Sequence, residues 1–319
     1  MSNRYLLILV LYALASFGSI LAIAEAAAWL LRKQALSVIE RLRPQDGVIA
    51  HLVLRLLPAL LALLLTSLSA VPGYFKGEPI GTHELPGPWL IGLAIVGLYS
   101  LIAPLVQVAW LAARTQARTK RWLQTAIGGE SFSNFPVIEL GLEQPVIVAS
   151  GVLTKSIWIS SAVRSLLSPR ELRAALRHEA AHCRQNHNLA KLLCALAPRL
   201  LPAKMMEENL RETIEYAADD EACSIPGDGL NLASAVVTLA KQSAAPASSM
   251  LYTALVDPRQ AARLERRVER LVLPRQLGNS RIFVTLSSAC FAMIVCTAAI
   301  GSSPLAQHAF RETLELLVR

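Results

Sequence analysis

Charged residues are scarce in this chain of 319 residues. They make up 17% of the sequence, against roughly 25% in ordinary globular proteins. That composition excludes a disordered, fibrous or highly charged protein. The five cysteines form no CxxC pair and no regular framework, so the sequence indicates neither disulfides nor a zinc site built on thiolates. Hydrophobic residues make up 54%, and the mean hydropathy is +0.44. These values predict several membrane spans with a polar domain between them.

Four apolar runs are long enough to cross a bilayer, which takes about 20 helical residues. They cover residues 6–31, 52–71, 89–113 and 282–302. The alanine-rich end of the first run is similar to a signal-peptide cleavage site, but the run is too long and its basic start too weak, so we interpret it as a retained span. Glu25 lies near the end of that span, and we interpret it as an acid that reaches the lipid headgroups rather than one with a chemical role.

The distribution of lysine and arginine predicts the orientation of these spans, because basic residues accumulate on the cytoplasmic side of bacterial-type spans. They are concentrated on both flanks of segment 114–281 and between the first two runs, whereas loop 72–88 holds only Lys76. Residues 1–113 would then contain three spans, with the N-terminus and the loop outside, segment 114–281 in the cytoplasm and the short tail 303–319 outside. We interpret the net charge of +8 as part of this pattern, so no direct nucleic-acid partner is expected.

Segment 114–281 is long enough for one packed domain, with strands at its start and helices after them. Residues 146–149 and 156–160 have the composition of strands, and the second could bind an extended peptide if it lies at a sheet edge. Ser168 and Glu171 form an S-x-x-E capping box, which predicts the start of a long helix. From this point on, helices are predicted at about 169–197, 202–223, 230–241 and 259–272.

The first of these helices contains the sequence His178-Glu179-Ala180-Ala181-His182. Because a helix turns about 100° per residue, His178 and His182 stack on one face and can share one Zn²⁺ at about 2.0–2.1 Å. Glu179 is offset by a quarter turn, which suits it to take a proton from a water that the metal activates. The alternative is a chance match on a surface helix, expected in about one chain in a hundred of this length. The pattern therefore predicts a zinc site with Glu179 as the catalytic base.

A catalytic zinc site needs a third protein ligand. The next predicted helix carries acidic residues that share one face, and these are Glu208, Glu212, Glu215 and Asp219. Taken alone, such a stripe is typical of a solvated helix face. Next to a helix that supplies only two ligands, it predicts that Glu215 binds the metal and that Asp219, one turn later, accepts the second N–H of a ligating histidine.

These motifs resemble those of a known class of enzymes. A Glu-x-x-Ala-Asp sequence about thirty residues after HExxH is similar to the signature of gluzincin-type membrane metallopeptidases. That class includes the CAAX prenyl and HtpX-type proteases and the β-lactam sensor-transducers of the BlaR/MecR type. The run-up from Pro145 to Leu172 and the three spans before the motif resemble the BlaR/MecR type, because HtpX-type enzymes usually place two spans on each side. The resemblance implies an α+β gluzincin-like zinc peptidase domain inserted between transmembrane helices of a predominantly α-helical protein.

Two features depart from that resemblance. Many relatives have aspartate at the position of His187. On a continuous helix His187 would be rotated about 140° from His182, so we interpret it as a structural residue or a support for a ligand rather than a ligand itself. The antibiotic-sensing relatives also carry a penicillin-binding domain after the last span, whereas only residues 304–319 follow it here. Sensing of β-lactams is therefore not expected.

The function that the resemblance implies is that of a zinc-dependent endopeptidase, with one Zn²⁺ per chain, in the cell (inner) membrane. Its expected partners are the lipid bilayer and a protein substrate such as a BlaI/MecI-type transcriptional repressor. An HtpX-like quality-control protease and a non-catalytic membrane signal transducer remain alternatives, and the intact Glu179 disfavours the second. The basic helix 259–272 is expected to lie on anionic lipid rather than on nucleic acid.

Overall fold

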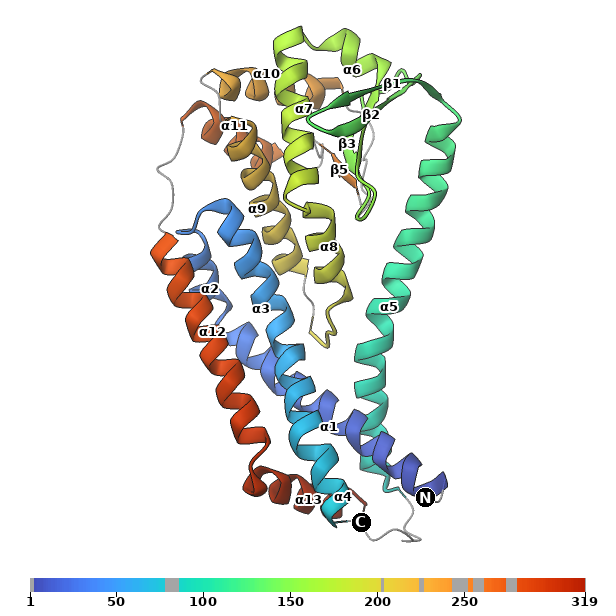
Figure 1. Cartoon of the computed structure of the whole chain (residues 1–319), viewed down its shortest axis with the longest axis vertical. Helices are drawn as coiled ribbons and strands as arrows, with labels where there is room; N and C mark the ends of the chain where they lie inside the picture. The colour runs from blue at the N-terminus through green and yellow to red at the C-terminus, as the bar shows by residue number, and fades with distance from the viewer. Residues whose placement is uncertain are drawn as a thin grey trace.

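The structure is a computed structural model that describes residues 3–77, 86–201, 204–223, 227–242, 252–254, 261–273 and 280–318. A bundle of long helices forms one end of the molecule, and a small sheet with shorter helices forms the other (Figure 1). The α5 helix (Pro88–Leu123) runs from the bundle to the sheet. The prediction of a predominantly helical protein with an α+β part is confirmed.

Among the described residues, four helices are long and apolar enough to cross a membrane. They are α1 (Asn3–Leu30), α3 (Pro44–Leu65) with its continuation, α5, and α12 (Ser280–Gly301). Each coincides with one of the predicted apolar runs. The α3 and α5 helices extend beyond their apolar runs toward the α+β end, so both are long enough to contact it.

The bundle also contains shorter elements. They are α2 (Arg32–Ile39), the π-helical turn η1 (Thr66–Ala70), α4 (Val71–Gly77) and α13 (Pro304–Val318). The tail expected after the last span is therefore mostly the α13 helix, which packs against α4 and η1. There Lys76 Nζ donates a hydrogen bond to Gln307 Oε1 at 2.6 Å. Residues 78–85 of the predicted outer loop lie outside the described residues.

The α1 and α5 helices cross where both carry glycine. A Cβ atom added to Gly97 would lie 2.0 Å from the carbonyl oxygen of Leu14, and one added to Gly18 would lie 2.8 Å from the Gly97 Cα. Neither position has room for a side chain unless the helices move apart. Small residues are common where membrane helices pack closely, because contact between backbones supplies most of the attraction there.

The sheet has five strands in the order β1-β2-β4-β3-β5. They are β1 (Ala126–Phe132), β2 (Phe135–Leu140), β3 (Ile147–Ser150), β4 (Ser156–Ser160) and β5 (Tyr252–Ala254). The strands expected from composition are β3 and β4. The β1–β2 hairpin was not expected, and its turn residues Ser133 and Asn134 both have positive φ, which suits a tight connection between antiparallel strands.

The β4 strand is an internal strand of this sheet. It pairs in parallel with β2 and antiparallel with β3. Residues 156–160 therefore offer no free edge, and the suggestion that they bind an extended peptide there is wrong. The outer side of β3 is paired with β5, where Ala149 lies opposite Thr253.

The helix predicted over residues 169–197 is in fact two helices, α7 (Pro169–Arg184) and α8 (His187–Leu196). The break lies at Asn186, whose backbone is left-handed with a φ of 56°. Asparagine adopts this conformation more easily than most residues with a side chain, and it often ends helices for that reason. The prediction of one continuous helix is wrong, and the break gives His187 a direction that helical periodicity does not anticipate.

The remaining helices agree more closely with the sequence. They are α9 (Lys204–Ala222), α10 (Asp228–Gln242) and α11 (Ala261–Val272), whereas the short α6 helix (Ser161–Leu166) was not predicted. The α7 helix begins with the predicted capping box, in which Ser168 N donates to Glu171 Oε2 at 2.8 Å and Glu171 N donates to Ser168 Oγ at 3.4 Å. This cap fixes where α7 begins and so the direction in which its later residues point.

Two hydrophobic cores position the helices that matter below. One packs the sheet against α7, where Ile157 and Ile159 contact a face of α7 that carries Ala175 and Ala180, small enough for the helix to lie close to the strands. The other is shared between the two ends of the molecule. In it Val48 of α3 packs with residues of α8 and α9 that share one buried face, namely Ala190, Cys194, Leu210, Ile214 and Ala217.

Gly97→Leu should destabilise the bundle, because its side chain would need the space that Leu14 occupies. Overpacking of this kind costs about 1–3 kcal/mol, so the thermal unfolding midpoint of the protein in detergent should fall. Gly92→Leu, on the same helix, should unfold close to wild type, since no described atom lies within 4 Å of its Cβ position. Equal midpoints for the two variants would contradict the close crossing of α1 and α5.

Candidate metal centre

The two histidines of the HExxH motif converge at one point. Both project from α7, and their Nε2 atoms lie 3.0 Å apart. Both side chains are buried, His178 completely and His182 to within 2%. Two nitrogen ligands of a tetrahedral zinc ion at about 2.0–2.1 Å would lie about 3.3 Å apart. The observed spacing is therefore close to what a shared metal requires.

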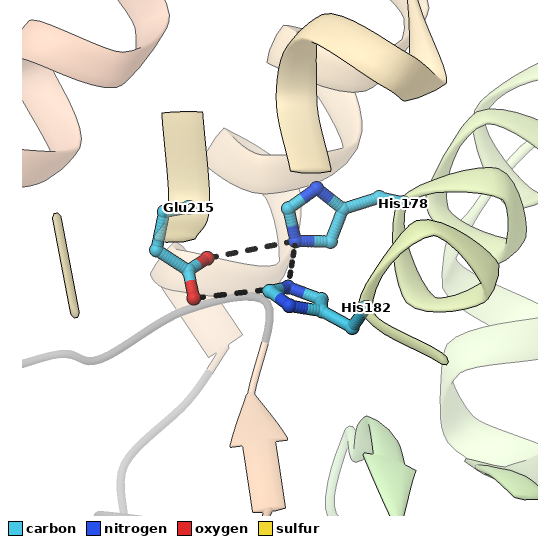
Figure 2. A group of neighbouring side chains, drawn as sticks. All are labelled: His178, His182 and Glu215. Atoms are coloured by element: carbon cyan, nitrogen blue, oxygen red, sulfur yellow. Dashed lines mark hydrogen bonds and ion pairs between the residues drawn. The ribbon is translucent and has the colours of Figure 1, made fainter. Parts of the chain in front are cut away.

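Glu215 of α9 faces this pair of nitrogens (Figure 2). Its Oε2 lies 3.5 Å from His178 Nε2, and its Oε1 lies 3.7 Å from His182 Nε2. One atom from each of the three side chains falls within 4.8 Å of the others. The donor set of two imidazoles and one carboxylate is one that zinc accepts, with a fourth position left for water or substrate. The three residues predicted as ligands are thus brought together, and they fit a zinc ion.

The outer nitrogen of each histidine also has a partner. His178 Nδ1 lies 2.9 Å from Asp219 Oδ1, as expected for a carboxylate that orients a metal-binding imidazole. Burial by itself lowers the pKa of His178, but the hydrogen bonds with Asp219 and Glu215 raise it to about 9 in the metal-free site. A metal that binds at Nε2 therefore has to displace a proton.

His182 is supported by another histidine rather than by an acid. Its Nδ1 lies 2.7 Å from His187 Nδ1, and His187 Nε2 lies 3.0 Å from Gln185 Oε1. If His182 uses Nε2 for the metal, its Nδ1–H must donate to His187, whose Nε2–H then donates to Gln185. Burial lowers the pKa of His187 to about 3, in keeping with the neutral ring that this chain of bonds needs. The break at Asn186 makes the contact possible.

Glu179 is fully buried beside the two histidines, and the sheet holds it there. The backbone N–H of Ala149 on β3 donates to Glu179 Oε2 at 2.6 Å, whereas Oε1 has no hydrogen-bond partner among the described residues. Burial raises the pKa of Glu179 to about 8. The carboxyl group thus has one oxygen anchored and one free to exchange a proton, as a general base requires.

Arg267 of α11 is a residue of the site that sequence reasoning missed. Its Nε and Nη2 donate to the two oxygens of Asp219 at 3.0 and 2.8 Å, and its Nη1 lies 3.0 Å from Glu215 Oε2. The side chain is only 8% exposed. Burial raises the pKa of Asp219, but the charge of Arg267 and the bond to His178 outweigh burial and lower it. Arg267 therefore keeps Asp219 ionised and fixes the carboxylate that faces the histidines.

The other arginines of α11 follow the same pattern. They pair with acidic residues of α9 at helical intervals, namely Arg263 with Glu208 at 3.2 Å, Arg266 with Glu212 at 2.9 Å and Arg270 with Asp220 at 2.7 Å. The expectation that this basic helix lies on lipid is wrong for these side chains, and so is the alternative that the acidic stripe is simply solvated. The matching periods of the two helices were visible in the sequence, but nothing local indicated that they face each other.

Comparison with known protein families supports this reading of the site. Residues 114–245 match the family described as Peptidase family M48, whose members are zinc-dependent metallopeptidases. The match spans the HExxH motif and the Glu215–Asp219 segment, and it ends before Arg267. That family covers both BlaR/MecR-type and HtpX-type membrane enzymes, so the match does not separate the two. No curated protein matches the chain.

Arg267→Gln should weaken metal binding about 10–100-fold, the range typical for residues that orient metal ligands by hydrogen bonds without touching the metal. The reason is that Glu215 and Asp219 would lose the cation that fixes both. Titration of the metal-free protein with Zn²⁺ against a competing chelator measures the change. Arg266→Gln is the matched control, because Arg266 contacts Glu212 and is 54% exposed. If both variants bind Zn²⁺ like wild type, Arg267 has no part in holding the site.

Proposed function

We propose that this protein is an integral membrane zinc-dependent endopeptidase. The observation that carries the proposal is the convergence of His178, His182 and Glu215 on one buried point. Glu179 lies beside them, and its Oε1 is buried with no hydrogen-bond partner among the described residues, so it can accept a proton. The likeness of residues 114–245 to a metallopeptidase family supports it. The four span-length helices support the membrane location.

The described residues divide the chemistry between them. His178, His182 and Glu215 would hold the zinc ion, which would supply an acidified water and polarise a peptide carbonyl. Glu179 Oε1 takes the proton from the attacking water and later delivers it to the leaving amine. Ala149 N–H keeps Glu179 turned toward the histidines while this happens. Asp219 keeps the His178 ring aligned.

The sheet suggests where a peptide substrate would lie. The β3 strand is the one that contacts Glu179, through Ala149. Extended peptides commonly bind by adding a strand to a sheet edge. The outer side of β3 is paired with β5, so a substrate that bound in this manner would take the place of Tyr252–Ala254. Pairing at β3 replaces the earlier suggestion of pairing at residues 156–160.

The membrane orientation and the substrate are the finer parts of the proposal. The lysines and arginines that flank the spans favour an outside N-terminus and a cytoplasmic metal centre in the inner membrane. A cytoplasmic site reaches only cytosolic proteins and the inner membrane face. The likeness of the motifs to BlaR/MecR-type proteins favours a regulator such as a transcriptional repressor of the BlaI/MecI type, cleaved in a signalling pathway. A quality-control protease of the HtpX type is the second candidate, and a non-catalytic transducer the third.

Glu179→Gln should keep the metal and lose proteolysis. The amide can still accept the bond from Ala149, but it cannot take a proton, and loss of a general base costs about 10²–10⁴-fold in rate. Zinc content by elemental analysis and cleavage products by proteomics measure the two effects. The exposed Glu143 supplies the control variant, Glu143→Gln, which should match wild type in both.

The same comparison tests the class of substrate. Products present with wild type and absent with Glu179→Gln should be few and should include a DNA-binding regulator. A long series of unrelated membrane proteins would favour the quality-control enzyme instead. Wild-type cleavage by Glu179→Gln would remove the assigned base, and zinc-loaded protein without any substrate would favour the transducer.

Reporter fusions test the orientation. A reporter active only in the cytoplasm should work when fused after Thr125 and fail when fused after Phe310, because basic residues flank the third and fourth apolar runs on the side of the metal centre. A reporter active only outside should give the opposite result. External activity at Thr125 would invert the orientation and exclude a cytosolic substrate.

A further inference from the structure

The linker between α8 and α9 is held by the span-length helices. This linker lies between the helix that begins with His187 and the helix that begins at Lys204 and carries Glu215, and residues 197–201 are the part of it that the structure describes. In Figure 1 it lies between α3 and α5, at the end of the α8–α9 pair that points into the bundle, and α8 packs against both of these helices. Non-helical backbone at such a position needs partners for its N–H and C=O groups.

Arg55 of α3 supplies the donors. Its Nη2 donates to the carbonyl oxygen of Ala197 at 2.8 Å, and its Nη1 donates to that of Pro198 at 3.1 Å. These carbonyls lie at and just beyond the C-terminal end of α8, where no further helical turn can satisfy them. The Arg55 side chain is 5% exposed, so the guanidinium is shielded from solvent and depends on these protein contacts for its hydrogen bonds.

Glu25 of α1 supplies the acceptors. Its Oε2 accepts the backbone N–H groups of Leu200 and Leu201 at 2.8 and 2.9 Å, and its Oε1 lies 3.3 Å from Arg55 Nη1. The side chain is 7% exposed. The interpretation of Glu25 as an acid that reaches the lipid headgroups is therefore wrong.

The third side of the linker is held from α5. Arg199 bonds with Gln107 of α5 and, at 2.6 Å, with Glu207 Oε1 on the first turns of α9. Helices α1, α3 and α5 thus each contribute one polar side chain to the same short linker. We refer to Glu25 and Arg55, with the linker groups that they bind, as the clamp.

The distances argue that the clamp serves the linker rather than the bundle alone. Charged groups among membrane helices are costly, and those that persist usually have a function. The contact between Arg55 and Glu25 is the longest of the set at 3.3 Å, whereas each side chain makes a shorter bond to the linker backbone. An ion pair that only joined α1 to α3 would favour the opposite ranking.

The α8–α9 pair connects the clamp to the metal site. His187, about 15 Å from the linker by helical rise, bonds to His182, and Glu215 faces both ligating histidines. Ala190 and Ile214 belong to the core that packs α8, α9 and Val48 of α3 together. If the linker is displaced, α8 and α9 should therefore move together, because a close-packed core transmits strain rather than absorbing it.

We propose that Glu25 and Arg55 are positioning residues of the metal centre, which act through the 197–201 linker to set how Glu215 and His187 stand against His178 and His182. This inference rests on the proposed function. It predicts that changes in the clamp alter the affinity and geometry of a site that neither residue touches. Because such coupling is reciprocal, metal binding at the site should in turn stabilise the contacts of the linker.

The test uses the full-length protein in nanodiscs, with Co²⁺ in place of Zn²⁺ because its visible absorption reports ligand geometry. Glu25→Gln and Arg55→Lys should each weaken Co²⁺ binding about 3- to 30-fold, the usual range for coupling through a packed network, and should change the absorption spectrum. Glu40→Gln, at an exposed acid near the same end of the bundle, should match wild type.

The charge-swapped double variant, Glu25→Arg with Arg55→Glu, separates a clamp from a plain ion pair. The swap keeps one positive and one negative charge. However, the new arginine at position 25 would face the N–H groups of the linker, and the new glutamate at position 55 would face its carbonyl oxygens, so neither could form the original hydrogen bonds. We expect it to bind Co²⁺ no better than the single variants. Wild-type affinity and spectrum in the swap, or in both single variants, would overturn the inference.

Hydrogen exchange on the wild-type protein gives an answer that does not depend on whether any variant folds. Metal loading should slow exchange at the Leu200 and Leu201 amides by the same coupling factor, while the Ala306 amide at the far end of the bundle should not change. Unaltered exchange at the linker overturns the inference alone. A wild-type protein that shows no tetrahedral Co²⁺ absorption overturns the proposed function, and the inference with it.

Discussion

The site depends on burying several ionisable groups away from bulk solvent. Glu179 and Asp219 are almost completely buried, and a charge in such a place is costly unless it is paired. Arg267 neutralises part of the negative charge, and Lys191, whose pKa burial lowers to about 8, lies close enough to act on Glu179 and Glu215. The Nε2 atoms of the two buried imidazoles face each other at 3.0 Å, so their lone pairs repel unless a cation lies between them. A divalent metal with open coordination meets that need.

Local signals in the sequence predicted the parts of this arrangement that are local in space. The capping box fixed the start of α7, the spacing of HExxH placed two nitrogens on one face, and the apolar runs located the four long helices. Each depends on residues within a few turns of one another, so periodicity is enough. Glu215, the proposed third ligand, could be predicted only because the HExxH motif supplies two ligands and a stripe of acidic residues follows it.

The missing parts depend on contacts between distant segments. Nothing near Arg267 indicates that it faces Asp219 rather than lipid, and nothing near Glu25 indicates that it binds a linker far along the chain. Strand order is equally non-local, which is why the sequence left open whether residues 156–160 lie at a sheet edge. Asn186 is the exception, because asparagine is a known helix terminator and its left-handed conformation could have been anticipated.

The metal centre is built from two halves with different supports. His178, Glu179 and His182 lie on α7, which is packed against the sheet and fastened to it by Ala149. Glu215 lies on α9, which is held by the clamp at one end and by Arg267 of α11, the helix before the fourth span, along its length. Any shift of the spans relative to the sheet therefore acts on the distance between the carboxylate and the imidazoles. That distance decides whether three ligands can hold one metal. A movement of the membrane helices would therefore change metal binding through the linker and α9.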